Sequence, residues 1–162
     1  MGANQQLFEQ LNKLRGSKTI IVGIGNTLKG DDGAGPFICE QLRKAGVNAE
    51  VIDAGTVPEN YIQPIVKNAP QNLLVIDAID FGVSPGEIGI FRPEQLSSLV
   101  ISTHILSPRH FVDMIRQDLD ADVYFVGIQP AQTRIGESVS AEVADAIQWL
   151  VGTLAEIFPP EE

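Results

Sequence analysis

Residues 19–24 read Thr-Ile-Ile-Val-Gly-Ile, a run that is almost wholly apolar and rich in β-branched side chains. Such a run, without alternating polar residues, is typical of a strand that is covered on both faces. Similar runs occur at 73–76 and 123–126, and a less apolar short run occurs at 50–53. These runs predict the buried strands of a mostly parallel sheet, with 19–24 and 73–76 at its centre.

Segments with apolar residues at helical spacing separate the predicted strands. They are residues 7–14, 36–46, 59–66, 107–115 and 140–157. Strands that alternate with helices predict an α/β fold, a mostly parallel twisted sheet of about five strands sandwiched between helices. We expect residues 1–162 to form a single domain of this kind. Residues 86–91 alternate more and lie between two prolines, so they should form an edge strand.

The composition limits the classes of partner. Eleven basic and 21 acidic residues give a net charge of -10, which disfavours binding to nucleic-acid phosphates and to anionic membranes. This charge suits a cation or a basic partner, and it equally serves solubility. Cys39 is the only cysteine, so the sequence predicts no internal disulfide and a cytoplasmic location. No apolar run approaches the roughly 20 residues that cross a bilayer, so we expect no membrane insertion.

The turn after the first strand is rich in glycine and resembles a dinucleotide-binding fingerprint at first sight. However, Leu28 occupies the position of the third glycine, and Asp31 and Asp32 would face the pyrophosphate. The turn therefore argues against nucleotide binding. Its carboxylates suit a cation, or alternatively they cap the next helix.

Two further carboxylates end predicted strands. Asp77 directly follows the run at 73–76, where a carboxylate beside the core needs a ligand or a polar partner. A hydrogen-bonded aspartate at the end of a strand is the alternative. Asp53 ends the run at 50–53, and there a supporting role in the site and local turn chemistry with Gly55 explain it about equally well.

The sequence contains two histidines. His104 lies just before a predicted helix, at the edge where ligands of a parallel sheet gather, so it is a candidate metal ligand or general base. We interpret His110 as a surface or packing residue. Asp32, Asp77 and His104 together would provide two oxygens and one nitrogen for a divalent ion, and we expect them to lie within about 10 Å of one another.

The chain carries none of the common protease motifs: it has no His-Glu-x-x-His, no Asp-Thr-Gly and no Gly-x-Ser-x-Gly. It also has no cysteine nucleophile that is paired with a histidine. We interpret Cys39 as a buried helix residue. Serine and cysteine catalysis are therefore unsupported.

In their order along the chain, these residues resemble the hydrogenase maturation endopeptidases. The resemblance extends from residue 21 to about residue 150 and rests on motifs at 22–26, 30–35, 53–60, 77–80, 85–87, 103–104 and 127–130. It is closest to the branch that serves formate-hydrogenlyase-type [NiFe] hydrogenases, in which the first metal position is Asp, as here at Asp32. Ala54 departs from the family pattern, which more often has glycine at this position.

The resemblance implies an α/β fold with a metal site at the carboxyl edge of its sheet. Asp32, Asp77 and His104 match the nickel-contacting positions of the family. The implied reaction removes the C-terminal extension of the nickel-loaded large-subunit precursor of a [NiFe] hydrogenase. Nickel would arrive with this partner and bind transiently. As catalytic residues, Asp32 and Asp77 would either only hold nickel or activate the attacking water as in an aspartic protease.

Two other functions stay open from the sequence. One is a metal-dependent hydrolase of other peptides or amides, with a resident zinc ion. The other is a non-enzymatic acidic module that acts as a metal chaperone or as an escort of the precursor.

Overall fold

A computed structural model describes residues 2–99 and 108–161. Its five-stranded sheet has the order β2-β1-β3-β5-β4. The strands are β1 (Thr19–Ile24), β2 (Glu50–Gly55), β3 (Asn72–Ala78), β4 (Ile88–Phe91) and β5 (Asp122–Ile128). Strand β1 pairs in parallel with β2 and β3, and β3 pairs in parallel with β5. Strand β4 is antiparallel to β5. The predicted α/β fold is confirmed, as are the interior positions of β1 and β3.

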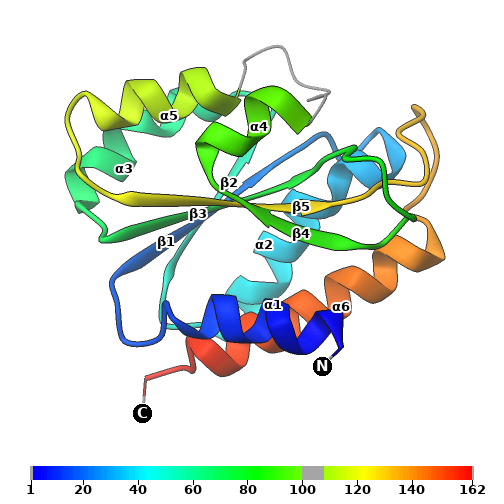
Figure 1. Ribbon diagram of the computed structural model, residues 1–162, viewed down its shortest axis with the longest axis horizontal. Helices are drawn as coiled ribbons and strands as arrows, with labels where there is room; N and C mark the ends of the chain where they lie inside the picture. Colours follow the sequence, from blue (N-terminus) through cyan, green and yellow to red (C-terminus); the bar gives the residue numbers. More distant parts are fainter. Residues whose placement is uncertain (1, 100–107, 162) are drawn as a thin grey trace.

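Helices cover both faces of the sheet (Figure 1). One face carries α1 (Ala3–Asn12), α2 (Ala34–Ala45) and α6 (Ala141–Ile157), and the other carries α3 (Ile62–Asn68), α4 (Pro93–Leu99) and α5 (Pro108–Arg116). Two short 3-10 helices, η1 (Gly30–Gly33) and η2 (Pro58–Tyr61), follow β1 and β2. Among the described residues, no helix combines the length and apolarity needed to cross a bilayer.

The side chains of β3 alternate between two cores. Leu74 and Ile76 pack in the core beneath α2 and α6, whereas Leu73 and Val75 pack in the core beneath α3 and α5. All residues of β1 and β3 are buried, as expected for strands that are covered on both faces. Because successive side chains of a strand point to opposite faces, Asp77 lies on the face of α3 and α5.

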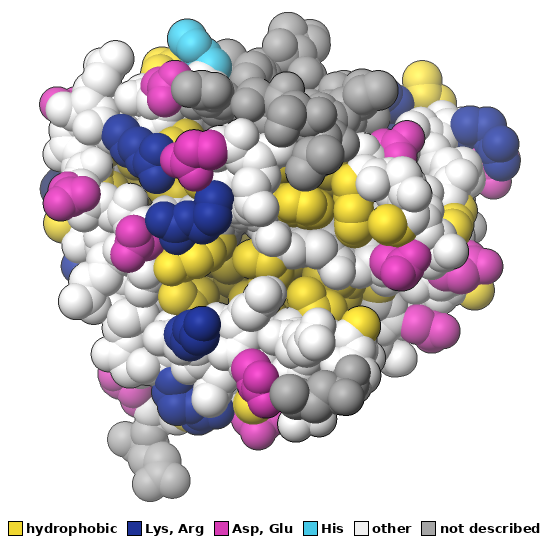
Figure 2. Space-filling view, viewed as in Figure 1, with side chains coloured by type: hydrophobic (Ala, Val, Ile, Leu, Met, Phe, Trp, Pro, Cys, Tyr) yellow, Lys and Arg dark blue, Asp and Glu magenta, His cyan; other side chains and the backbone are white. Residues whose placement is uncertain are grey.

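Strand β4 forms one edge of the sheet, as predicted from its flanking prolines. Its four residues are half-buried. Apolar side chains gather across the middle of the surface in this view, over the position of β4 (Figure 2). A hollow of about 310 Å³ lies between this edge and α1, and its apolar walls include Leu14, Ile90 and Tyr124.

Candidate active site at the carboxyl edge of the sheet

Asp32 lies in η1, directly after the turn that leaves β1. Its side chain is almost fully buried, with 1% exposure. One carboxylate oxygen, Oδ2, accepts a hydrogen bond from the backbone N–H of Asn26 at 2.9 Å. A bond of this kind stabilises the ionised carboxylate, which is the form that binds a cation or accepts a proton from water.

The glycines of this turn allow the chain to pack closely. Gly25 has φ +153°, and a Cβ there would lie 1.9 Å from the carbonyl oxygen of Asp32. A Cβ at Gly35 would lie 2.5 Å from the carbonyl oxygen of Ile24 and 2.8 Å from that of Ile76. Only glycine fits such approaches. The start of α2 is therefore pressed against the ends of β1 and β3, which explains the glycine pattern without a bound phosphate.

Asp77 is the next residue of β3 after Ile76, and it pairs with Gly127 of β5. Its exposure is 4%. Since β1 and β3 are parallel neighbours, Asp32 and Asp77 both lie at the carboxyl edge of the sheet, where ligands of such folds bind. Their expected approach to within about 10 Å of each other, and their role in a metal site, stay predictions.

His104 lies outside the described residues, so its predicted convergence with the two aspartates stays a prediction. The chain approaches this segment from α4 and continues into α5, and both helices cover the face of Asp77. Within the part of the chain that is described, no group of three or more His, Cys, Asp or Glu side chains could hold a metal ion. A three-ligand site at this edge therefore needs His104 or a group from a partner.

Asp31 has a structural role that differs from the helix cap offered by the sequence. Its buried carboxylate accepts hydrogen bonds from the backbone N–H groups of Ala131 (2.8 Å), Gln132 (3.3 Å) and Ser140 (2.7 Å), and from the Ser140 hydroxyl (2.9 Å). It does not cap α2, whose N-cap is Gly33. Instead, it joins η1 to the loop between β5 and α6.

Gln129, at the end of β5, was missed as a site residue from the sequence. Its Oε1 accepts hydrogen bonds from the backbone N–H groups of Phe81 (2.8 Å) and Val83 (3.4 Å), and its Nε2 donates to Asp80 Oδ1 (3.1 Å). The side chain is 6% exposed. Gln129 thus fixes the turn that follows Asp77. A polar residue at the end of a buried strand was the available signal, as it was for Asp77.

Asp53 is explained by turn chemistry. Its Oδ1 accepts a hydrogen bond from the backbone N–H of Gly55 at 3.1 Å. By strand alternation it points to the face of α2, away from the face of Asp77, and it lines a shallow cavity with Phe37 and Arg43 of α2. We therefore leave Asp53 out of the site.

His110 and Cys39 also have the predicted environments. His110 is exposed on α5. Cys39 is fully buried in α2, and its Sγ lies 3.5 Å from the carbonyl oxygen of Ile52. Burial, and then the charge of Asp53, raise the pKa of the Cys39 thiol to about 12. A thiol of this kind is a poor nucleophile at neutral pH.

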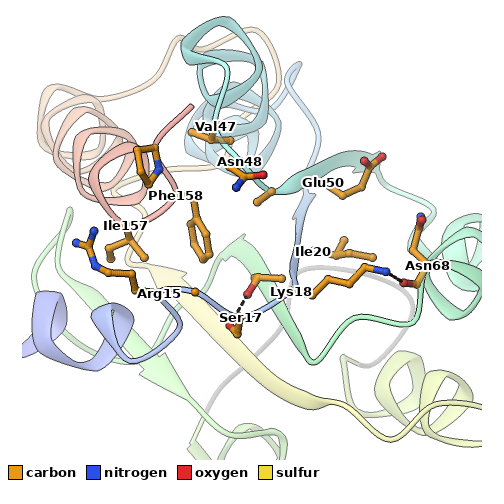
Figure 3. A pocket seen from close by; sticks show the side chains of 14 residues that line it. Arg15, Ser17, Lys18, Ile20, Val47, Asn48, Glu50, Asn68, Ile157 and Phe158 are labelled. Atoms are coloured by element: carbon orange, nitrogen blue, oxygen red, sulfur yellow. Dashed lines mark hydrogen bonds between the residues drawn. The ribbon is translucent and has the colours of Figure 1, made fainter. Parts of the chain in front are cut away.

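A cavity of about 730 Å³ lies at the opposite end of the sheet, at the amino ends of β1 and β2 (Figure 3). Its walls include Arg15, Lys18 and Glu50. The ammonium of Lys18 donates a hydrogen bond to the backbone carbonyl of Asn68, as the figure shows. Ligands of parallel sheets bind at the carboxyl ends of the strands, so we do not assign this cavity to a reaction.

Comparisons with known proteins agree with one another. The family described as "Hydrogenase maturation protease" matches residues 38–157. The hydrogenase 3 maturation protease of Escherichia coli is 35% identical over 131 residues, which cover 80% of this chain and 83% of that protein. The crystal structure of the [NiFe] hydrogenase maturation protease HycI from Thermococcus kodakarensis matches with a TM-score of 0.84 at 30% identity, over 91% of this chain and 97% of its own. For the solution structure of the endopeptidase HycI from Escherichia coli, the TM-score is 0.79 at 33% identity, over 86% and 90% of the two chains.

Proposed function

Since this chain belongs to the hydrogenase maturation protease family, we propose that it removes the C-terminal extension from the large-subunit precursor of a [NiFe] hydrogenase. The chain is accordingly a peptidase, similar to the HycI proteins. We further propose that its substrate is the nickel-loaded form of the precursor and that the reaction takes place in the cytoplasm. The single, buried cysteine is compatible with that compartment.

The observation that carries this proposal is the placement of Asp32 and Asp77. Both carboxylates are buried at the carboxyl edge, on adjacent parallel strands or their turns. Carboxylate oxygens suit a divalent cation, and an imidazole from His104 would complete a mixed oxygen and nitrogen set. Nickel belongs to the substrate in this proposal, so the protease has to hold it only while the precursor is bound.

Two roles remain for the carboxylates in the cleavage step. In the first, Asp32, Asp77 and His104 only hold the nickel of the precursor and thereby position the scissile bond. In the second, one carboxylate also accepts a proton from the attacking water. The hydrogen bond from the backbone N–H of Asn26 stabilises the carboxylate form of Asp32, and this form suits the role of ligand or base.

The experiment compares nickel-loaded and nickel-free precursor after incubation with the purified protein, with the product masses determined by mass spectrometry. We expect a single C-terminal fragment to be lost from the nickel-loaded precursor only. Equal cleavage of both forms would contradict recognition through nickel. Tight binding without any cleavage would instead favour an escort, and a stoichiometric resident zinc ion would favour a different metallohydrolase.

A further inference from the structure

Exposed apolar side chains surround the carboxyl edge of the sheet. Among the described residues, the large hydrophobic side chains that are exposed are Leu28 (70%), Val57 (41%), Val83 (37%) and Ile135 (81%). They follow four different strands, β1, β2, β3 and β5. Because these four strands are parallel, all four side chains lie in loops at the edge that carries Asp32 and Asp77.

Leu28 and Ile135 are the most exposed of the four, and their loops are held together. The backbone N–H of Gly136 donates to the carbonyl oxygen of Leu28 at 2.9 Å. On the other side of Ile135, the backbone N–H of Arg134 donates to Oε1 of Gln132 at 3.0 Å. The loop after β5 projects beyond the end of the sheet, where Figure 1 shows it in orange. The two apolar side chains are thus presented to solvent from a fixed backbone.

The buried carboxylate of Asp31 joins the same two loops. Asp31 lies three residues after Leu28, and its carboxylate accepts hydrogen bonds from the backbone N–H groups of Gln132 and Ser140, which lie on the two sides of Ile135 in the sequence. A buried anchor of this kind keeps the exposed pair in place before any partner arrives. Preorganised contact residues lower the entropy cost of binding, so they contribute more to affinity than residues on a flexible loop.

Single exposed apolar residues are ordinary, but their gathering at one edge indicates a contact surface. The proposed substrate is a protein, so its surface must contact the rim of the site whenever the scissile segment lies at Asp32 and Asp77. An apolar rim fits a protein surface and does not fit a nucleic acid. Apolar anchors that become buried at the centre of an interface carry much of its affinity.

We propose that Leu28 and Ile135 form a docking pair that packs against an apolar patch on the folded body of the hydrogenase large-subunit precursor. This inference rests on the proposed function and names the part of the protease that selects the folded partner. The docking pair contacts the body of the precursor, while its C-terminal segment reaches the carboxylates. The pair therefore sets affinity for the precursor and takes no part in bond cleavage.

The test is the double variant Leu28→Ser/Ile135→Ser, with Leu28→Met/Ile135→Val as the matched control that keeps apolar side chains. Binding of nickel-loaded precursor is measured by calorimetry, and processing is measured over a range of precursor concentrations. We expect Kd and KM of the serine variant to rise by about tenfold or more, roughly 1.4 kcal/mol, with kcat unchanged. The control should stay within about twofold of the parent protein.

A serine variant that binds and processes the precursor like the parent protein would overturn the docking pair. A loss of kcat at unchanged KM would overturn it as well. The binding measurement separates this inference from the proposed function: if the parent protein binds without cleaving and the serine variant loses binding, the docking pair stands and the peptidase proposal fails. Melting curves should be unchanged, and the single variants Leu28→Ala and Ile135→Ala give the same readout if the double variant melts early.

Discussion

The carboxylate of Asp31 accepts a hydrogen bond from the backbone N–H of Ser140 at 2.7 Å, across 109 residues of chain. Ser140 is also the N-cap of α6, where its hydroxyl oxygen accepts from the backbone N–H of Val143 at 3.4 Å. The same hydroxyl donates to Asp31 at 2.9 Å. The turn that carries Asp32 and the beginning of the last helix are therefore one hydrogen-bonded unit.

Replacing Asp31 should destabilise the protein strongly. Asp31→Ala removes the buried carboxylate that accepts hydrogen bonds from the backbone N–H groups of Ala131 and Ser140, so we expect a loss of about 3 kcal/mol in the free energy of unfolding. Urea denaturation measures this loss. Asp145→Ala, at an exposed position of α6, should change stability by less than about 0.5 kcal/mol. Equal midpoints for both variants would show that the Asp31 network contributes little.

Two helical glycines should respond to alanine in opposite directions. Gly35→Ala brings a Cβ within 2.5 Å of the carbonyl oxygen of Ile24, so we expect a destabilisation of about 1–3 kcal/mol despite the better helix propensity of alanine. Gly152 lies inside α6 with open space around it, and Gly152→Ala should stabilise the protein by roughly 0.5–1 kcal/mol. Thermal melts of the two variants provide the comparison, and a stabilised Gly35→Ala would contradict the close packing.

The site variants Asp77→Asn and His104→Ala should each reduce precursor processing by at least about 10²-fold. The first removes the charge that binds a cation or assists water, and the second removes an imidazole ligand. His110→Ala is the control, because His110 is exposed on α5, and it should process normally. The measurement is the mass of the large subunit after incubation. Normal cleavage by both site variants would eliminate the proposed site.

The melting curves of these variants should stay close to that of the parent protein. Neighbouring carboxylates repel one another, so we expect Asp77→Asn to leave the melting temperature unchanged or to raise it slightly, as happens at many functional sites. Loss of cleavage together with early melting would instead assign Asp77 a structural role.

Cys39 should be unreactive in the folded protein. Its thiol is fully buried and its pKa is raised to about 12, so alkylation by iodoacetamide at pH 8.5 should proceed at least about 10²-fold more slowly than in urea. Because the folded-state pKa lies above the ordinary thiol value of 9.0, the thiol favours folding below about pH 9 and this contribution falls as the pH rises toward 12. Cys39→Ser should weaken that fall, and rapid labelling of the native protein would contradict the buried environment.

The main features of the fold were predictable because they depend on local pattern. Continuous apolar runs located β1, β3 and β5, and the prolines around 86–91 located β4 at the edge. The boundaries of α2 were less accurate: the helix begins at Ala34, before Pro36, because η1 leads directly into it. The spacing of apolar residues does not reveal that a 3-10 helix runs directly into an α-helix.

For the candidate site, the edge position of its two carboxylates was predictable because it depends on the ends of strands. Asp32 and Asp77 were located from the runs that precede them. The roles of Asp31 and Gln129 were not predictable, because their partners are distant in sequence: Asp31 binds Ser140, and Gln129 binds the turn at Phe81. Nothing in a local pattern specifies which loop a buried carboxylate will contact.

The bond between Asp31 and Ser140 also has a consequence during protein synthesis. At about 5–20 residues per second, the ribosome needs roughly 5–20 s to add the 109 residues that separate the two partners. Until then, the loop that carries Asp32 lacks its anchor, although β1 and β2 are already available to pair. A nascent chain therefore has the two aspartates long before it has the fixed geometry around them, so proteolytic competence arises only after Ser140 has been synthesised and can reach Asp31.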